Sequence, residues 1–228
     1  MSNEILFIIS ALLVFGAIVI TNRAFGKAGL FAWAAMIPVL ANLLTAKQIT
    51  VFGIDATMGT ILFSSMFLCT DILSENYGHK EAQRAAIIGA CAVAGYMLAT
   101  QIALLFTPNE YDFVNGAMQS VFGSSFRVSA GSLVCFMIAN LADVYLFQWL
   151  KEKQPQHLWL RNNVATMVCN VVENFVLMFI AFYGTFSAAE CIQLAIATSL
   201  IEVVVCLLDT PFMYIARSWR NQSEAGME

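Results

Sequence analysis

Residues 67–80 read FLCTDILSENYGHK, and they close an apolar run with two carboxylates, Asp71 and Glu75. The four-residue spacing places both acids on one face of a helix, one turn apart. Gly78 is the residue type that most readily ends a helix, so we expect the helix to stop there. Acids at the end of a membrane-length helix are costly unless a base or a ligand meets them, which makes this stretch the first candidate for a site.

The composition is that of an integral membrane protein. The chain has 228 residues, of which 60% are hydrophobic and 11% charged, and its mean hydropathy is +0.75. Soluble domains carry about 25% charged residues, so this chain cannot cover a water-facing surface. Its net charge is -4 and its basic residues are scattered rather than clustered, which gives no indication of nucleic-acid binding.

Seven apolar segments reach or approach the length of roughly 20 residues that a helix needs to cross a bilayer. They are residues 5–21, 29–46, 56–75, 85–106, 127–150, 163–184 and 189–216. Pro38 and Pro211 predict kinks in two of them. We expect an all-α integral membrane protein, a polytopic bundle of about six to seven transmembrane helices, folded as a single transmembrane domain over residues 1–228.

Two other parts of the chain affect this assignment. No basic region precedes the first apolar segment, so we interpret it as a retained helix rather than a signal peptide. The connection 107–125 carries apolar pairs at four-residue spacing, and both a short helix at the outer interface and a plain surface loop fit it.

The distribution of lysine and arginine predicts the orientation. If the N-terminus is outside, nine of the eleven basic residues fall on the inner side, where membrane proteins concentrate them, and only Lys47 and Arg127 fall outside. The nine are Arg23, Lys27, Lys80, Arg84, Lys151, Lys153, Arg161, Arg217 and Arg220. We therefore expect seven crossings of the cell (inner) membrane, with the C-terminus in the cytoplasm.

Acids and amides occur repeatedly inside the apolar segments. The acids are Asp71, Glu75, Asp143, Glu173, Glu202 and Asp209. Asn140 and Asn170 each stand three residues before an acid, which puts an amide and a carboxylate on one helix face. Arg127 is the one base expected within a helix, so several acids have no base at their own depth. They must be protonated, bridged by amides or opposed to a ligand.

Two interpretations of these acids remain. Any single acid can form a structural hydrogen bond between helices, and Asp71 and Glu75 can pair with Lys80 or Arg84 in the headgroup region. As a set, the acids favour a polar cavity in the inner half of the membrane. Acids accept hydrogen bonds and amides both donate and accept, so the cavity would suit a cation or a planar ligand rich in N–H donors.

Enzyme signatures are missing from the sequence. It has no H-E-x-x-H, G-x-S-x-G or P-loop pattern. His79 and His157 both fall in connections, and the six cysteines lie far apart in apolar segments. We therefore expect no enzyme, no metal site and no cofactor.

The motif Asp71-x-x-x-Glu75-x-Tyr77-Gly78, with Lys80 and Ala82, resembles the signature of the queuosine-precursor transporters, also called the vitamin-uptake transporter family. The likeness continues in chain order over about residues 40–185. Its other elements are Asn42 and Lys47 before Phe52-Gly53, Phe126-Arg127, Asn140-x-x-Asp143, Trp159-Leu160-Arg161-Asn162 with Thr166, and Asn170-x-x-Glu173.

The resemblance implies an importer of 7-deazaguanine precursors of the tRNA base queuosine, namely 7-cyano- and 7-aminomethyl-7-deazaguanine, with queuine as a substrate of some relatives. It implies a fold similar to the substrate-binding component of energy-coupling-factor vitamin transporters, working without an ATPase partner. The family-like core would cover about residues 29–216, with the helix at about 5–21 as an addition. The expected partners are the substrate and the lipid bilayer, with no nucleic acid. The oligomeric state is left open, a homodimer included.

We expect one central substrate site. Its proposed residues are Asn42, Asp71, Glu75, Arg127, Asn140, Asp143, Asn170 and Glu173. A carboxylate can accept the N1–H and 2-amino donors of a deazaguanine in a two-pronged bond, and an amide can donate to its O6. Two alternatives stay open: a proton- or cation-translocating carrier or channel that uses the same acids, and a substrate-binding subunit of an ATP-driven vitamin importer.

Overall fold

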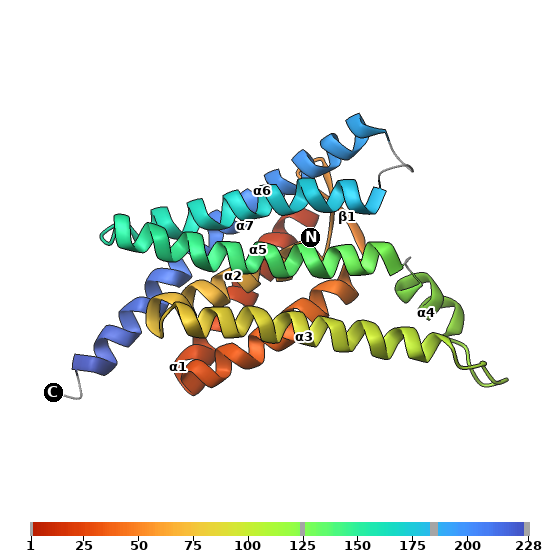
Figure 1. Ribbon diagram of the computed structural model, residues 1–228, viewed down its shortest axis with the longest axis horizontal. Helices are drawn as coiled ribbons and strands as arrows, with labels where there is room; N and C mark the ends of the chain where they lie inside the picture. Colours follow the sequence, from red (N-terminus) through yellow and green to blue (C-terminus); the bar gives the residue numbers. More distant parts are fainter. Residues whose placement is uncertain (1, 124–125, 183–186, 226–228) are drawn as a thin grey trace.

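The computed structural model describes residues 2–123, 126–182 and 187–225, and of residues 126–130, 181–182 and 221–225 it describes the backbone only. The elements in chain order are α1 (Asn3–Leu44), β1 (Gln48–Val51), β2 (Ile54–Thr57), α2 (Gly59–Asn76), α3 (His79–Leu104), α4 (Asn115–Phe122), α5 (Phe126–Lys153), α6 (Leu158–Phe182) and α7 (Ala188–Ala225). Within these residues, α1, α3, α5, α6 and α7 are long and apolar enough to cross a membrane. The predicted polytopic helical class is confirmed (Figure 1).

Helix α1 contains the first two predicted segments as two arms that meet at Gly26. This residue has φ +57° and ψ −141°, a backbone conformation that glycine alone adopts readily. The far ends of both arms lie at the β-hairpin: the Asn3 side chain donates to the carbonyl of Thr50 at 3.0 Å, and Leu44 leads into β1. The arms therefore run in opposite directions and form a V (Figure 1). With α2, α3, α5, α6 and α7 they correspond to the seven predicted segments.

The β-hairpin was not predicted, because most of it falls in the connection between the predicted segments 29–46 and 56–75. β1 and β2 pair antiparallel, with Gln48 opposite Thr57 and Val51 opposite Ile54. Phe52 and Gly53, between the strands, both have positive φ, as a tight two-residue hairpin turn requires.

Helix α4 resolves the two interpretations of the connection 107–125 in favour of a short helix. It packs against the end of α3, where the Gln101 side chain donates to the carbonyl of Phe122 at 2.7 Å and the ring of Tyr96 meets Phe122 edge-on. The residues of α4 are half-buried or exposed.

Helix α2 is the central element of the bundle. Its 18 residues are all buried except Phe63, and α1, α3, α5, α6 and α7 pack around it. The helix ends at Asn76, and Gly78 follows with φ +96°, which confirms the predicted stop. Because other helices surround α2, its polar side chains face protein rather than lipid.

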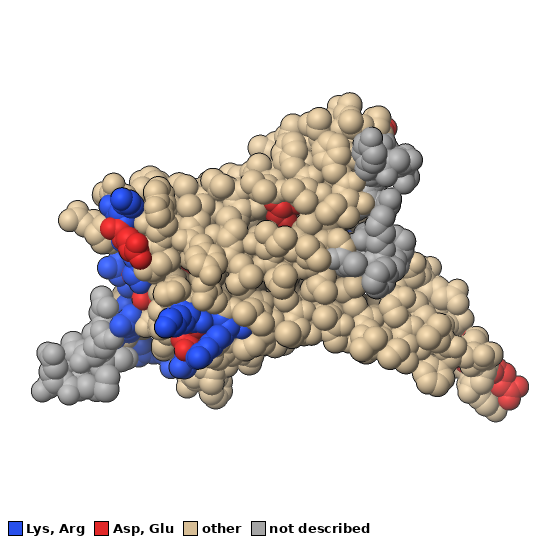
Figure 2. Space-filling model, viewed as in Figure 1, with Lys and Arg blue, Asp and Glu red and all other residues tan. Residues whose placement is uncertain are grey.

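One end of the bundle carries most of the positive charge. The Tyr77 hydroxyl donates to Asn22 at 3.1 Å, so the α1 bend and the α2–α3 turn lie together. The α5–α6 turn and the last turns of α7 reach the same end through contacts of Arg161 and Arg217 with Glu75. Lysines and arginines gather there in Figure 2. We call this the basic end; the β-hairpin and α4 lie toward the opposite end (Figure 1).

The conformation of Gly26 yields a stability prediction. We expect Gly26→Ala to lower the free energy of unfolding by about 1–3 kcal/mol, because alanine is strained at this backbone conformation. An added Cβ would meet only the Tyr77 hydroxyl, at 3.5 Å, so crowding is not the cause. The control is Gly95→Ala, since Gly95 lies within α3 with no atom within 4 Å of an added Cβ. Thermal unfolding in detergent compares the two, and equal midpoints would contradict the prediction.

Candidate functional site

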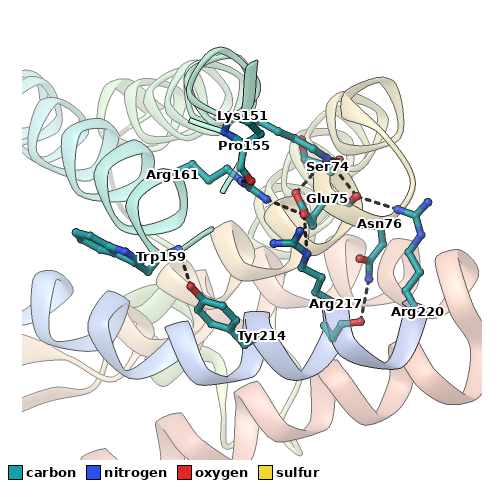
Figure 3. Close-up of polar contacts among 11 residues, drawn as sticks. Ser74, Glu75, Asn76, Lys151, Pro155, Trp159, Arg161, Tyr214, Arg217 and Arg220 are labelled. Carbon is teal, nitrogen blue, oxygen red and sulfur yellow. Dashed lines mark hydrogen bonds and ion pairs between the residues drawn. The ribbon is translucent and has the colours of Figure 1, made fainter. Parts of the chain in front are cut away.

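The polar groups inside the bundle form three layers, and the first lies at the basic end around Glu75. Its carboxylate pairs with Arg161 at 2.7 Å, with Lys151 at 3.0 Å and with Arg217 at 3.3 Å. Its backbone carbonyl accepts hydrogen bonds from Lys151 at 3.2 Å and from Arg220 at 3.0 Å. Figure 3 shows Glu75, on α2, surrounded by cations from α5, α6 and α7. We call these five residues the Glu75 cluster.

Arg161 corrects a sequence-based inference. We expected no buried base other than Arg127, but the Arg161 side chain is 1% exposed. It lies in the first turn of α6, where its guanidinium donates to the carbonyl of Pro155 at 2.9 Å and stacks over the ring of Phe147. The pairing of Glu75 with Lys80 or Arg84 is also wrong, since Arg84 instead pairs with Glu81, at 2.7 Å.

The middle layer holds acids that have no such cations. Asp71, one turn before Glu75 on α2, is fully buried, and so is Asp143 on α5. The two carboxyls lie within hydrogen-bonding reach of each other. Because both are acceptors, they can bond to each other only through a shared proton. Thr166 on α6 donates to Asp143 Oδ1 at 3.2 Å.

Helices α6 and α7 complete this layer with paired polar side chains. Asn162 donates to Asp209 Oδ1 at 2.7 Å, and Asp209 interacts electrostatically with Asp71 and Asp143. Asn163 donates to the Thr210 hydroxyl at 2.8 Å. Asp209 thus has an amide donor and Asp143 a hydroxyl donor, whereas Asp71 has no donor among the described residues.

Several buried oxygen atoms of this region accept no hydrogen bond from the described part of the chain. They are Asp71 Oδ1 and Oδ2, Asp143 Oδ2, Asn140 Oδ1, Asn162 Oδ1 and Asn170 Oδ1. Asn140 lies on the same face of α5 as Asp143, and Asn170 lies one turn beyond Thr166 on α6, so these residues occupy adjacent turns of facing helices. We call the five residues the acceptor cluster. A buried acceptor without a donor is costly, and a ligand that carries N–H groups would satisfy it.

The third layer lies further from the basic end. Asn174 on α6 donates to Glu202 at 2.6 Å and to the Ser199 hydroxyl at 3.2 Å, both on α7. Glu173 is half-buried and lines a pocket of about 390 Å³ whose other walls are apolar side chains of α5 and α6, Cys135 and Cys169 among them. These acids are separated from the acceptor cluster by about one helical turn or more along α6.

The structure brings together four of the sequence-predicted site residues: Asp71, Asn140, Asp143 and Asn170. Glu75 lies one turn away in its own ion-pair cluster, and Glu173 lies in the third layer. Asn42 lies near the other end of the bundle, beside the start of α2, where its side chain donates to the carbonyl of Pro38 at 2.8 Å. The side chain of Arg127 falls outside the described residues.

Sequence reasoning did not place Asn162, Thr166 or Asp209 in the site. One signal was available, because Asn162, Thr166, Asn170 and Asn174 recur every four residues and so mark one polar face of α6. In the described residues, no group of three or more histidine, cysteine or acidic side chains is arranged to hold a metal ion.

In the described part of the chain, five helices that are long and apolar enough to cross a membrane, packed around buried polar side chains, define a polytopic membrane protein. Residues 57–216 match the family described as "Putative vitamin uptake transporter", and the chain belongs to this family. It is 33% identical over 219 residues to a Bacillus subtilis (strain 168) protein named "Probable queuosine precursor transporter", covering 95% of this chain and 96% of that protein.

A Haemophilus influenzae (strain ATCC 51907 / DSM 11121 / KW20 / Rd) protein of the same printed name is 24% identical over 161 residues, which cover 69% of this chain and 66% of that protein. No solved structure matches the chain significantly. The family and these relatives identify the chain as a membrane transporter, and the recognition made from the motif at residues 71–82 is confirmed.

The burial of Arg161 yields a second stability prediction. We expect Arg161→Gln to lower the free energy of unfolding by about 3–5 kcal/mol, because it removes the closest cation from a buried carboxylate. Arg84→Gln is the control, since it breaks the Arg84–Glu81 pair in which the arginine is 68% exposed, and we expect a loss of about 0.5 kcal/mol or less. Thermal unfolding in detergent measures both. An equal loss of unfolding free energy in the two variants would contradict a stabilising role for the buried Arg161–Glu75 pair.

Proposed function

We propose that this transporter imports the 7-deazaguanine precursors of queuosine, 7-cyano- and 7-aminomethyl-7-deazaguanine, and binds them at the acceptor cluster. One observation carries the proposal: six buried oxygens of the cluster accept no hydrogen bond from the described residues, and a donor-rich ligand would supply the missing donors. The printed names of the two relatives support the same class of substrate. Queuine is a further candidate of the same chemistry.

The chemistry of a 7-deazaguanine matches the cluster group by group. Its N1–H and 2-amino groups form adjacent donors that one carboxylate, from Asp71 or Asp143, accepts in two-pronged fashion. Its O6 takes a donor from an amide such as that of Asn170. An aminomethyl substituent adds a cation, for which the second carboxylate is the natural partner. Adenine would leave these acceptors unpaired, so the site would select strongly against it.

The proposed contact residues are therefore Asp71, Asn140, Asp143 and Asn170, with Asn162 and Thr166 orienting neighbouring groups. Glu173 was predicted as a further substrate-binding residue, but it lines a pocket with otherwise apolar walls and is not among the proposed base contacts.

We place the basic end in the cytoplasm, because cytoplasmic loops of membrane proteins are enriched in lysine and arginine. The N-terminus then lies outside and the C-terminus inside the cell (inner) membrane. In this orientation the acceptor cluster lies in the inner half of the bundle, about one to three helical turns from the cytoplasmic surface.

An ion-translocating carrier is the alternative with an observation of its own. Glu202 and Asp209 lie two turns apart on α7 and each is bonded to an asparagine of α6, which gives a protonatable group in two successive layers. The two functions differ in what the site recognises. An ion carrier needs no base-shaped site, so a deazapurine would neither bind nor raise its thermal stability.

The test of the proposed function is rescue of tRNA queuosine in a cell that makes no precursor and lacks its own importer. Each candidate base is supplied in turn, with this chain expressed or absent. We expect queuosine to appear only when the chain and a 7-deazaguanine are both present. Uptake by liposomes that contain only the purified protein would further show that no ATPase partner is required.

Two aspartate variants test the site. We expect Asp71→Asn and Asp143→Asn each to reduce uptake of labelled precursor by at least about tenfold, because each removes a charged acceptor from the ligand while nearly keeping its shape. Asp55→Asn on the hairpin is the control, since Asp55 is exposed and bonds only to Thr50 among the contacts described. Uptake is compared at equal amounts of folded protein. Normal uptake by both variants would remove the acceptor cluster from the proposal.

A further inference from the structure

The Glu75 cluster joins four helices at a single carboxylate. Glu75 belongs to α2, Lys151 to α5, Arg161 to α6, and Arg217 and Arg220 to α7. Figure 3 shows the side chains of α5, α6 and α7 converging on the end of α2. As long as these contacts hold, the four helices cannot separate at the basic end.

The acceptor cluster is built on three of these four helices and lies directly behind the Glu75 cluster. Asp71 is one turn deeper than Glu75 on α2, and Asn162 adjoins Arg161 on α6. Asp143 precedes Lys151 by eight residues, which is about 12 Å along α5. A molecule held among these helices can therefore reach the basic end only by passing the Glu75 cluster.

The Glu75 cluster contains more positive than negative charge, so its attraction between helices depends on the single carboxylate. Three cations face one carboxylate, and they lie on three different helices. Without that carboxylate, like charges would oppose each other between α5, α6 and α7. Glu75 is therefore the group that turns repulsion among these helices into attraction.

The cations that pair with the Glu75 carboxylate also differ in solvent exposure. Arg161 is 1% exposed, whereas Lys151 is 30% and Arg217 38% exposed. Water can replace the protein partner of an exposed ion pair at little cost, but not that of a buried one. The outer two pairs can thus open first, which suits a contact that must alternate between two states rather than one that only fastens the fold.

We propose that the Glu75 cluster is the gate that closes the basic end of this transporter, and that Glu75 is the residue that holds it shut. The proposal uses the transporter role alone and does not depend on the identity of the substrate. In the transport cycle, separation of Lys151 and Arg217 from Glu75 lets α5 and α7 move apart and connects the middle layer with water at the basic end.

Cys206 provides a native reporter of this opening. It lies on α7 with no exposed surface, its thiol is 3.5 Å from Asn163, and it precedes Arg217 by eleven residues, about 16 Å along the helix. In a protein whose other five cysteines are replaced by alanine or serine, a membrane-impermeant thiol reagent modifies Cys206 only when water reaches the middle layer. Labelling of Lys153→Cys, at the exposed end of α5, first establishes on which side of a vesicle the basic end lies.

The experiment compares the rate of Cys206 labelling from the basic-end side in three backgrounds, with no substrate present. We expect Glu75→Gln to raise the rate by about tenfold or more, because a closed state that loses its central anion no longer predominates. Glu81→Gln is the matched control: Glu81 pairs with Lys27 and Arg84 at the same end but between α1 and α3, so its loss leaves the rate unchanged. Labelling from the opposite side should not accelerate in either variant.

A folding defect must be separated from opening. Glu75→Gln leaves Arg161 buried without its partner, so the double variant Glu75→Gln/Arg161→Gln removes both charges of that pair and should unfold at a higher temperature than the single variant while still labelling fast. Equal labelling rates in the Glu75→Gln, double and Glu81→Gln proteins would overturn the gate. Acceleration from both sides of the membrane, which indicates a loosened bundle, would overturn it as well.

Discussion

A carboxylate inside a helical bundle needs a partner, and helix α2 places two of them, Asp71 and Glu75, where the packing of other helices buries their side chains. The other helices meet this requirement in different ways. At the basic end, α5, α6 and α7 contribute cations to Glu75. One turn deeper, the described side chains that they contribute are another carboxyl, amides and a hydroxyl. Two adjacent turns of α2 therefore differ: Glu75 is paired with cations, whereas the oxygens of Asp71 accept no hydrogen bond from the described residues.

The two regions depend on each other through their shared helices. The Glu75 cluster holds α5, α6 and α7 against α2, and the same packing keeps the acceptor cluster away from water, where its hydrogen bonds would be weak. Asp71 and Glu75 lie one turn apart on the same face of α2. A shift of this helix that changes the contacts of one residue therefore also changes those of the other. The proposed site and the proposed gate beside it therefore share the same helices.

Much of this arrangement follows from the sequence. The apolar lengths predict the helices, Gly78 predicts the end of α2, and the Asn140-x-x-Asp143 pattern marks the polar face of α5, whereas Glu173 of the second pattern lines a pocket with apolar walls. What the sequence cannot supply is the relative depth of residues on different helices. Asn42 matches the family motif but lies at the end of the bundle opposite the basic end. Arg161 was expected in a connection, but its guanidinium is buried over the ring of Phe147. The β-hairpin escaped prediction because its turn, Phe52-Gly53, lies in a segment too short to show alternation.

In the proposed function, the middle-layer oxygens that accept no hydrogen bond from the described residues recognise a planar base with adjacent N–H donors. Calorimetric titration of the purified protein in nanodiscs, with 7-aminomethyl-7-deazaguanine and adenine in parallel, tests it most directly. We expect saturable binding of the deazaguanine with one site per chain, no measurable binding of adenine, and loss of the deazaguanine signal in the Asp71→Asn/Asp143→Asn double variant. Equal binding of both bases, or unchanged binding by the double variant, would contradict it.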